Sequence, residues 1–357
     1  MDPIWTIAVC TRNRAGMLAR CLGAIKALRV PPGLEFELLV VLSACQDDSR
    51  AVAEAAGLDH CLRVVELAEP GIARARNAAI ENATASYLAY LDDDVVAPPD
   101  YLGKLERARG QDPDCDAFAG PIMPGFLDSP PTWVLEAGQF DVSRREHGEY
   151  LPDAPFMRGF LVDYHLPGPS RRYTWGLLRP FSANMAFKLD AIRAIGPGPF
   201  ASGGPFVPEM GKGGAWEIMG EDTEIWMRLE QLHRPRRYIH DLLVEHLHEA
   251  ARLTPARLFR WAWERGATLT FLRYAYPPFL GVIPGFDMLA ARITAGPSGA
   301  LPLGPLDELI ARAAAEVGPD PSWEQIEPHV TAFERHGRHA GLTLIGRLTE
   351  MPLTGAE

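Results

Sequence analysis

The segment that decides the fold is Ser86-Tyr87-Leu88-Ala89-Tyr90-Leu91-Asp92-Asp93-Asp94, an apolar run that ends in three consecutive carboxylates. The run from Ser86 to Leu91 predicts a buried strand. Because an extended backbone alternates sides, Asp92 and Asp94 are expected to point one way and Asp93 the other. Mg²⁺ and Mn²⁺ take oxygen ligands from one or two carboxylates and from phosphates, so the triplet is a candidate cation site. A solvated acidic turn explains the triplet alone equally well.

Around this segment the chain alternates between predicted strands and predicted helices. Strands are expected at residues 4–10, 36–42 and 61–67, and helices at 17–28, 47–56 and 73–82. Such alternation predicts right-handed crossovers and a mostly parallel, Rossmann-like sheet in an α/β fold. Ligands of these sheets bind at the carboxyl ends of strands, where both the triplet and the polar turn at residues 11–14 are expected.

The second half of the chain is less regular. Loops dominate residues 121–179, regular structure is expected to return at 183–187, and a glycine-rich stretch covers 196–214. A helix is predicted from Glu221 to His233, and residues from Arg252 onward look helical. We therefore expect a main domain over residues 1–250 and a mainly helical C-terminal extension over 251–357.

Composition narrows the class of protein. Of the 357 residues 47% are hydrophobic and 23% charged, which is typical of a soluble globular chain. The net charge of −11 argues against a nucleic-acid partner. The five cysteines have no paired spacing and are expected to be reduced thiols. The sequence has neither a signal-peptide pattern nor an apolar stretch of spanning length, so a cytoplasmic protein is predicted.

Six short motifs occur in order between about residues 5 and 265. They are Thr11-Arg12-Asn13-Arg14, Gly71-Ile72-Ala73-Arg74-Ala75-Arg76-Asn77, Asp92-Asp93-Asp94, Asn184-Met185-Ala186-Phe187, Glu221-Asp222 and Val244-Glu245-His246. Each motif alone is a weak signal. Together, in this order and spacing, they resemble the inverting family 2 glycosyltransferases, whose GT-A fold binds nucleotide-diphospho-sugars.

The resemblance implies a role for each motif. Residues 1–120 would be the nucleotide-sugar half and 121–250 the acceptor half of a catalytic domain. Asp94 and His246 would hold a divalent cation, Mn²⁺ or Mg²⁺, and Asp92 would contact the donor ribose. The nucleotide-sugar pocket would be formed by Thr11, Arg14, Arg76, Asn77, Asp92 and Asp93. For His246, a structural histidine is the alternative.

The pair Glu221-Asp222 is the candidate catalytic pair, with Asp222 as the general base. A sugar hydroxyl is a poor nucleophile, so a carboxylate must accept its proton during attack. A helix N-terminus keeps a carboxylate ionised, which suits a base; simple N-capping is the alternative. One base and no obvious nucleophile favour transfer with inversion. We expect hexosyl-type transfer to a hydroxyl in polysaccharide, glycolipid or secondary-metabolite glycoside synthesis.

The donor and acceptor are less defined. In the family the second strand usually ends in an aspartate that reads the nucleobase, but Leu42 stands there, so UDP, GDP and dTDP donors all remain open. Carbohydrate, lipid-linked and small-molecule acceptors also remain open, and so does the oligomeric state. Asn184 and Trp216 are candidate acceptor or lid residues, with Trp216 in a mobile lid that includes the glycine-rich stretch. An ordinary flexible loop with a core tryptophan is the alternative.

Residues 252–273 combine basic and aromatic side chains. Such a helix can lie on an anionic membrane, which would give peripheral contact at the inner face. A helix packed on the catalytic domain explains the pattern more simply. Two alternative functions remain open for the chain. One is that of a nucleotidyltransferase, but the glycine-rich loop with a Lys or Arg expected after the first strand is missing. The other is sugar-nucleotide binding without transferase activity.

Overall fold

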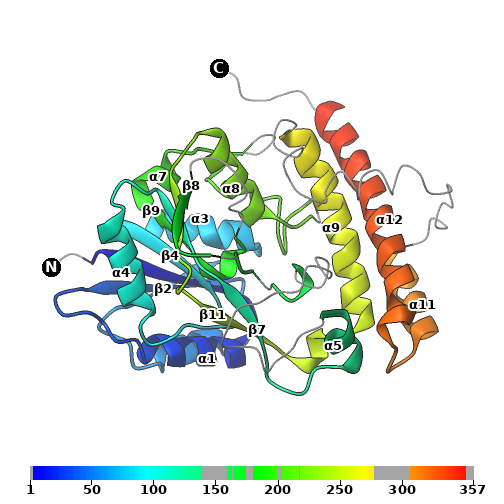
Figure 1. The fold of residues 1–357 in the computed structure, drawn as a ribbon, viewed down its shortest axis with the longest axis horizontal. Helices are drawn as coiled ribbons and strands as arrows, with labels where there is room; N and C mark the ends of the chain where they lie inside the picture. Colours follow the sequence, from blue (N-terminus) through cyan, green and yellow to red (C-terminus); the bar gives the residue numbers. More distant parts are fainter. Residues whose placement is uncertain are drawn as a thin grey trace. The chain divides into compact units, whose positions relative to one another are not determined.

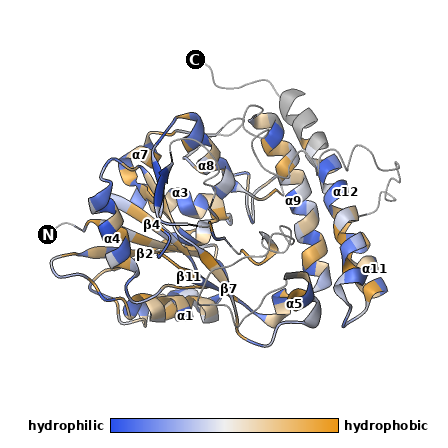
Figure 2. Ribbon diagram, viewed as in Figure 1, coloured by the Kyte–Doolittle hydropathy of each residue, from blue (hydrophilic) through white to orange (hydrophobic). Residues whose placement is uncertain are grey.

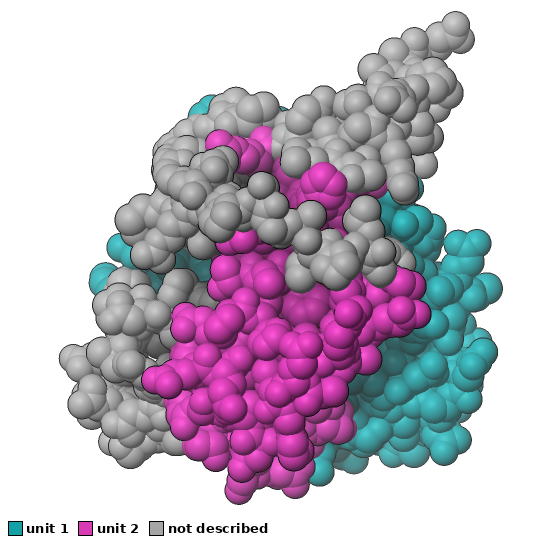
Figure 3. All heavy atoms as spheres, turned by 90° about the vertical axis from the view of Figure 1, so that its right-hand side faces the viewer, with its two compact units in different colours: residues 1–125, 162–247 teal, residues 126–161, 248–357 magenta. Residues whose placement is uncertain are grey.

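The computed structural model divides the chain into two compact units, residues 1–125 with 162–247 and residues 126–161 with 248–357, coloured separately in Figure 3. Each unit is described by itself. The structure describes residues 3–138, 159–162, 164–166, 168–173, 180–198, 203–216, 218–276 and 305–350.

Unit 1 is built on an eight-stranded sheet with the order β3-β2-β1-β4-β9-β6-β10-β8. Four neighbouring strands are parallel to one another: β3 (Leu62–Leu67), β2 (Phe36–Ser43), β1 (Trp5–Thr11) and β4 (Tyr87–Asp92). The predicted α/β fold with a largely parallel sheet is thus confirmed, and the triplet begins at the carboxyl end of β4 (Figure 1).

The other half of the sheet is mixed. Strand β9 (Met185–Lys188) runs antiparallel to both β4 and β6 (Ala117–Ala119). Beyond β6, β10 (Arg236–Tyr238) is parallel to it and β8 (Arg171–Tyr173) is antiparallel at the edge.

A small second sheet contains β5, β11 and β7, in that order. Strand β5 (Val95–Val96) directly follows the triplet and pairs with β11 (Val244–His248), while β7 spans Ile122–Phe126. The pairing sets His246 opposite Val95. A residue far along the chain is thereby brought next to the end of β4.

Helices cover both faces of the large sheet. The first face packs on α1 (Ala15–Lys26), α2 (Ser49–Glu54) and α4 (Tyr101–Gln111), and the second on α3 (Ile72–Asn82), α7 (Leu189–Arg193) and α8 (Glu221–Gln231). Strand β2, mainly hydrophobic in Figure 2, alternates between the two cores. Burial of each large aliphatic side chain contributes about 1.5–3 kcal/mol, so the two layers hold the sheet in place.

Unit 2 is helical where the structure describes it. It contains α5 (Thr132–Gly138), the 3₁₀ turn η3 (Ala250–Arg252), α9 (Pro255–Ala275), α11 (Leu306–Val317) and α12 (Trp323–Glu350). Thr254 caps α9 by accepting a hydrogen bond from the Arg257 N–H, and Pro255 opens the helix. Leu258 and Phe259 of α9 pack in one core with Phe333 of α12. The predicted helical C-terminal extension is confirmed.

Helices α9 and α12 approach each other through glycines. A Cβ atom at Gly337 would collide with the carbonyl oxygen of Trp263, and one at Gly266 with that of Glu334. Two of the arginines expected to face a membrane form ion pairs inside this unit, Arg260 with Asp307 and Arg265 with Glu334. These contacts hold α9 against α11 and α12 within this unit, and the membrane contact stays a prediction. Among the described residues, every helix is too short or too polar to cross a bilayer.

Candidate active site

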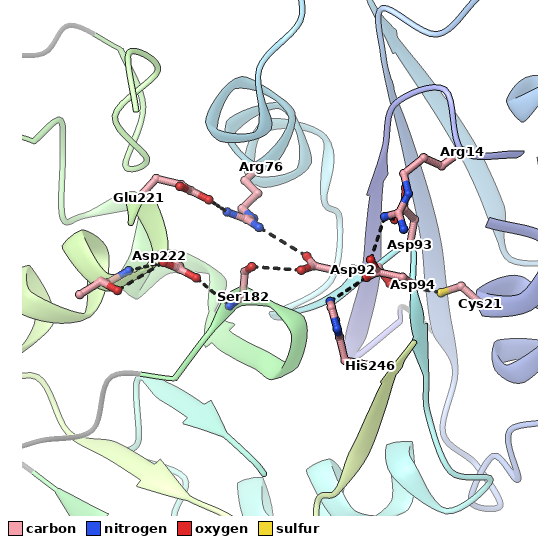
Figure 4. Close-up of polar contacts among 11 residues, drawn as sticks. Arg14, Cys21, Arg76, Asp92, Asp93, Asp94, Ser182, Glu221, Asp222 and His246 are labelled. Carbon is pink, nitrogen blue, oxygen red and sulfur yellow. Dashed lines mark hydrogen bonds and ion pairs between the residues drawn. The ribbon is translucent and has the colours of Figure 1, made fainter. Parts of the chain in front are cut away.

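The triplet and His246 form a compact group of possible metal ligands. One ligand atom from each of Asp92, Asp94 and His246 lies within 4.8 Å of the other two. His246 Nε2 is 3.1 Å from Asp94 Oδ1, and the Leu247 N–H donates to the Asp94 carbonyl at 2.7 Å. Figure 4 shows His246 reaching from β11 to the end of β4.

Asp93 is not one of the three possible ligands, and together with Asp94 it lies in the turn that follows β4. Its Oδ2 accepts a hydrogen bond of 2.6 Å from the Thr11 hydroxyl, and its Oδ1 pairs with Arg14. Arg14 also contacts Asp94 Oδ2 at 2.8 Å. Burial raises the pKa of Asp93 to about 6, against the lowering effect of Arg14. Thr11 and Asp93 are thus hydrogen-bonded to each other inside the protein. The contacts of Asp93 with Thr11 and Arg14 hold the triplet in place.

The donor atoms suit a divalent cation. Asp94 and His246 are buried and Asp92 is half-buried, so adjacent carboxylates are held in an environment that disfavours uncompensated negative charge. Arg14 neutralises part of that charge. Carboxylate oxygens and an imidazole nitrogen are ligands that Mn²⁺ accepts. The group therefore fits the expected cation.

Arg76 ties this group to α8. Its guanidinium is 2% exposed, forms an ion pair with Glu221 and lies 3.4 Å from Asp92 Oδ1. The Tyr90 hydroxyl donates to the Arg76 carbonyl at 2.8 Å, and the Phe206 ring lies 5.7 Å away from the guanidinium carbon. Arg76 was expected to line the nucleotide pocket; its contacts are with two protein carboxylates instead.

Asp222 lies in the first turn of α8, and both of its carboxylate oxygens accept backbone hydrogen bonds. The Ser182 N–H donates to Oδ2 at 3.0 Å and the Thr223 N–H to Oδ1 at 2.7 Å. Burial and the charge of Glu221 raise the pKa of Asp222 to about 6, against the lowering effects of Arg76 and of the two backbone hydrogen bonds. The helix N-terminus was expected to keep this carboxylate ionised; burial and the charge of Glu221 favour the protonated form instead.

Ser182 joins the two parts of the site, and no sequence motif pointed to it. Its hydroxyl donates to Asp92 Oδ2 at 3.2 Å while its N–H binds Asp222. Figure 4 shows Ser182 between the two carboxylates. The metal-ligand group and Asp222 therefore belong to one site.

Two asparagines of the motifs have internal roles. Asn184 is fully buried: its Nδ2 donates to the carbonyls of Pro121 at 3.0 Å and Leu242 at 2.6 Å, and its Oδ1 accepts from the Tyr101 hydroxyl at 3.2 Å. Asn184 was expected to contact the acceptor. Its side chain is instead fully buried and hydrogen-bonded within the protein. Asn77 likewise bonds both the N–H and the carbonyl of Phe206.

The described part of the glycine-rich stretch is tied to its surroundings. Arg228 donates to the carbonyls of Gly196, at 2.7 Å, and Pro205, and the Ile72 N–H donates to the Lys212 carbonyl at 3.0 Å. Trp216 is half-buried, and its backbone N–H donates to Glu209 at 2.9 Å. These contacts hold the described part of the stretch to its neighbours, and the assignment of Trp216 to a lid stays a prediction.

Position 42, where the family has the aspartate that reads the nucleobase, is buried. Leu42 is 1% exposed and lies in the core on the α1 face. The neighbouring Ser43 hydroxyl accepts a 3.1 Å hydrogen bond from the Gly71 N–H. The leucine therefore has a packing role, and its side chain selects no base by hydrogen bonding.

Comparison with known proteins supports the family resemblance. Residues 6–166 match the family model for glycosyl transferase family 2. The succinoglycan biosynthesis protein ExoM of Rhizobium meliloti (strain 1021) is 30% identical over 137 residues, 38% of this chain and 43% of ExoM. The putative glycosyltransferase EpsH of Bacillus subtilis (strain 168) is 27% identical over 113 residues, 31% of this chain and 32% of EpsH. The chain thus spans less than half the length of either relative.

A solved structure shares the fold. The mannosyltransferase PcManGT from Pyrobaculum calidifontis, solved with GDP-Man and Mn²⁺, superposes with a TM-score of 0.53 at 18% identity, over 96% of this chain and 88% of that one. The predicted GT-A fold is confirmed, and so is the resemblance to family 2 glycosyltransferases.

Proposed function

Because residues 6–166 carry a family 2 glycosyltransferase sequence, we propose that this chain transfers a sugar from a nucleotide-diphospho-sugar to an acceptor hydroxyl, with inversion at the anomeric carbon. One observation carries the proposal. The carboxylates of Asp92 and Asp222 are both hydrogen-bonded to Ser182, so a cation-binding group and a candidate base serve the same site.

Asp92, Asp94 and His246 would hold the divalent cation, Mn²⁺ or Mg²⁺. A cation bound there supplies positive charge for the leaving diphosphate. The Mn²⁺ bound to PcManGT supports this assignment. Arg14, whose charge lies beside Asp94, would contribute a further phosphate contact.

Asp222 would accept the proton of the acceptor hydroxyl as its oxygen bonds to the anomeric carbon. The bond from that carbon to the diphosphate breaks in the same displacement, which inverts the centre. A buried carboxylate with a raised pKa is a stronger base than an exposed one, which suits this role. Glu221 would position α8 through Arg76 and would not touch substrate.

The donor is a nucleotide-diphospho-sugar of UDP, GDP or dTDP type, and the GDP-Man bound to PcManGT makes a GDP-sugar one of the first to test. The resemblance to the succinoglycan biosynthesis protein ExoM supports a carbohydrate or lipid-linked acceptor in polysaccharide synthesis. Residues 1–120 would bind the donor and 121–250 the acceptor.

A thermal-shift screen of sugar nucleotides with Mn²⁺ tests the donor assignment. A ligand present at about 100 times its Kd stabilises the folded state by about 2.7 kcal/mol, which raises Tm measurably. We expect one base and sugar to raise Tm only when Mn²⁺ is present. If no sugar nucleotide raises Tm, the proposal fails. If one does but no donor is ever consumed, the chain is a sugar-nucleotide-binding protein.

A further inference from the structure

Ser182 lies in a turn that the fold holds firmly beside the triplet. It opens the 3₁₀ turn η2 (Ser182–Asn184), which leads directly into β9. Strand β9 pairs antiparallel with β4 up to Met185 opposite Tyr90, so the turn runs past the end of β4. The three side-chain hydrogen bonds of Asn184 fix the other end of the turn. Ser182 therefore has little freedom to move.

Two donors of this one residue bind two different carboxylates. The hydroxyl donates to Asp92 Oδ2 at 3.2 Å, and the backbone N–H donates to Asp222 Oδ2 at 3.0 Å. Hydrogen bonds to ionised carboxylates are stronger than neutral ones and orient the acceptor. Since both donors belong to one short residue, the two hydrogen bonds limit how far the two carboxylates can separate.

The remaining contacts of the two carboxylates differ. Asp222 keeps its bond from the Thr223 N–H at 2.7 Å on the other oxygen. The other oxygen of Asp92 has a longer contact of 3.4 Å with Arg76. Loss of the Ser182 hydroxyl would thus loosen Asp92 and leave the backbone bond to Asp222 unchanged.

We propose that Ser182 is a positioning residue that sets the spacing between the cation-binding carboxylate of Asp92 and the base Asp222. Its hydroxyl orients Asp92 toward the cation, and its N–H orients Asp222 toward the acceptor hydroxyl. This inference rests on the proposed function. Groups that orient metal ligands from outside the ligand set usually change metal affinity or activity about 10- to 100-fold when removed.

The two roles can be separated with Ser182→Ala, which removes the hydroxyl and retains the N–H. We expect this variant to bind Mn²⁺ at least about tenfold more weakly, measured from the free Mn²⁺ signal in electron paramagnetic resonance. The acid limb of the pH profile for nucleoside diphosphate release should not move, because the N–H still holds Asp222. Ser182→Thr keeps a hydroxyl and should restore Mn²⁺ binding to within about threefold.

Thr6→Val is the matched control. Thr6 is fully buried, and its hydroxyl donates to Glu37 at 2.8 Å near the start of β1. It tests loss of a buried hydroxyl–carboxylate bond at the opposite end of the strand from Thr11, and Mn²⁺ binding should be unchanged. Thermal melts of all variants establish that each is folded.

Wild-type Mn²⁺ affinity in Ser182→Ala would overturn the inference, as would an equal loss in Thr6→Val or no recovery in folded Ser182→Thr. Each of these results leaves the proposed function standing. If the wild-type chain itself binds no Mn²⁺, the proposed cation site fails and this inference fails with it.

Discussion

Arg76 of α3 forms a buried ion pair with Glu221, the first residue of α8. The second nitrogen of the same guanidinium lies 3.4 Å from Asp92. The helix that carries the candidate base is thereby fastened to the candidate cation site. We propose that this ion pair contributes to the stability of unit 1 and to the position of the candidate base, and the two contributions can be measured separately.

Arg76→Met should destabilise unit 1 strongly. It leaves Glu221 buried without a partner, and breaking a buried ion pair from one side costs about 3–5 kcal/mol. Urea unfolding measures the change. The double variant Arg76→Met with Glu221→Gln should recover much of the lost stability. Arg50→Met, which removes a half-exposed arginine from its pairs with Glu54 and Glu66, is the control and should change stability little.

Asp222→Asn should abolish most turnover without preventing donor binding. Removal of a general base lowers kcat by about 10²- to 10⁴-fold. Donor binding, measured by thermal shift with Mn²⁺, should persist because the cation ligands are untouched. The exposed Asp59→Asn is the control and should have wild-type activity. Near-normal kcat in Asp222→Asn would remove this residue from the mechanism.

The pH dependence should carry the signature of Asp222. A base works only when ionised, and burial raises the pKa of Asp222 to about 6, so kcat should rise with pH through about 6 and level off above it. Asp93 has a similarly raised pKa, so the acid limb must be assigned. Glu221→Gln removes a charge that raises the pKa of Asp222, and should move the limb to lower pH. A limb that stays in place would exclude Asp222 as its source.

Unit 2 should be sensitive to one methyl group between its long helices. Gly337→Ala would place a Cβ atom against the Trp263 carbonyl, and overpacking of this kind costs about 1–3 kcal/mol. Gly23→Ala is the matched control, because nothing lies within 4 Å of a Cβ atom at that exposed position in α1. It should stabilise the protein by about 0.5–1 kcal/mol through helix propensity. Calorimetric melting compares the two; equal effects would argue against the close helix contact.

The sequence predicted the regular part of the fold well. The first four strands and three helices were expected within a few residues of where they lie, since apolar runs and helical spacing are local properties. Asp92 and Asp94 lie close together as expected, but a turn at residues 93–94 replaces the extended backbone on which that prediction relied. The family resemblance, which rests on the order of the motifs along the chain, predicted that His246 lies next to the triplet.

Long-range pairing accounts for what the sequence left out. The family resemblance assigned Arg76 and Asn77 to the nucleotide pocket. A motif does not say which partner a side chain faces, and in the fold these two contact Glu221 and Phe206. Asn184 was assigned to the acceptor, but segments that are distant in the sequence bury it completely. Ser182 gave no signal, because one of its two contacts comes from the backbone.

The most direct test of the central claim is release of nucleoside diphosphate from UDP-, GDP- and dTDP-sugars, measured with Mn²⁺ and with excess EDTA. The account predicts release from at least one donor with Mn²⁺, near-complete loss with EDTA, and a loss of at least about 100-fold in both Asp94→Asn and His246→Ala. Release that is unaffected by EDTA and by both substitutions would contradict the assignment of this group of residues as the cation site of a glycosyltransferase.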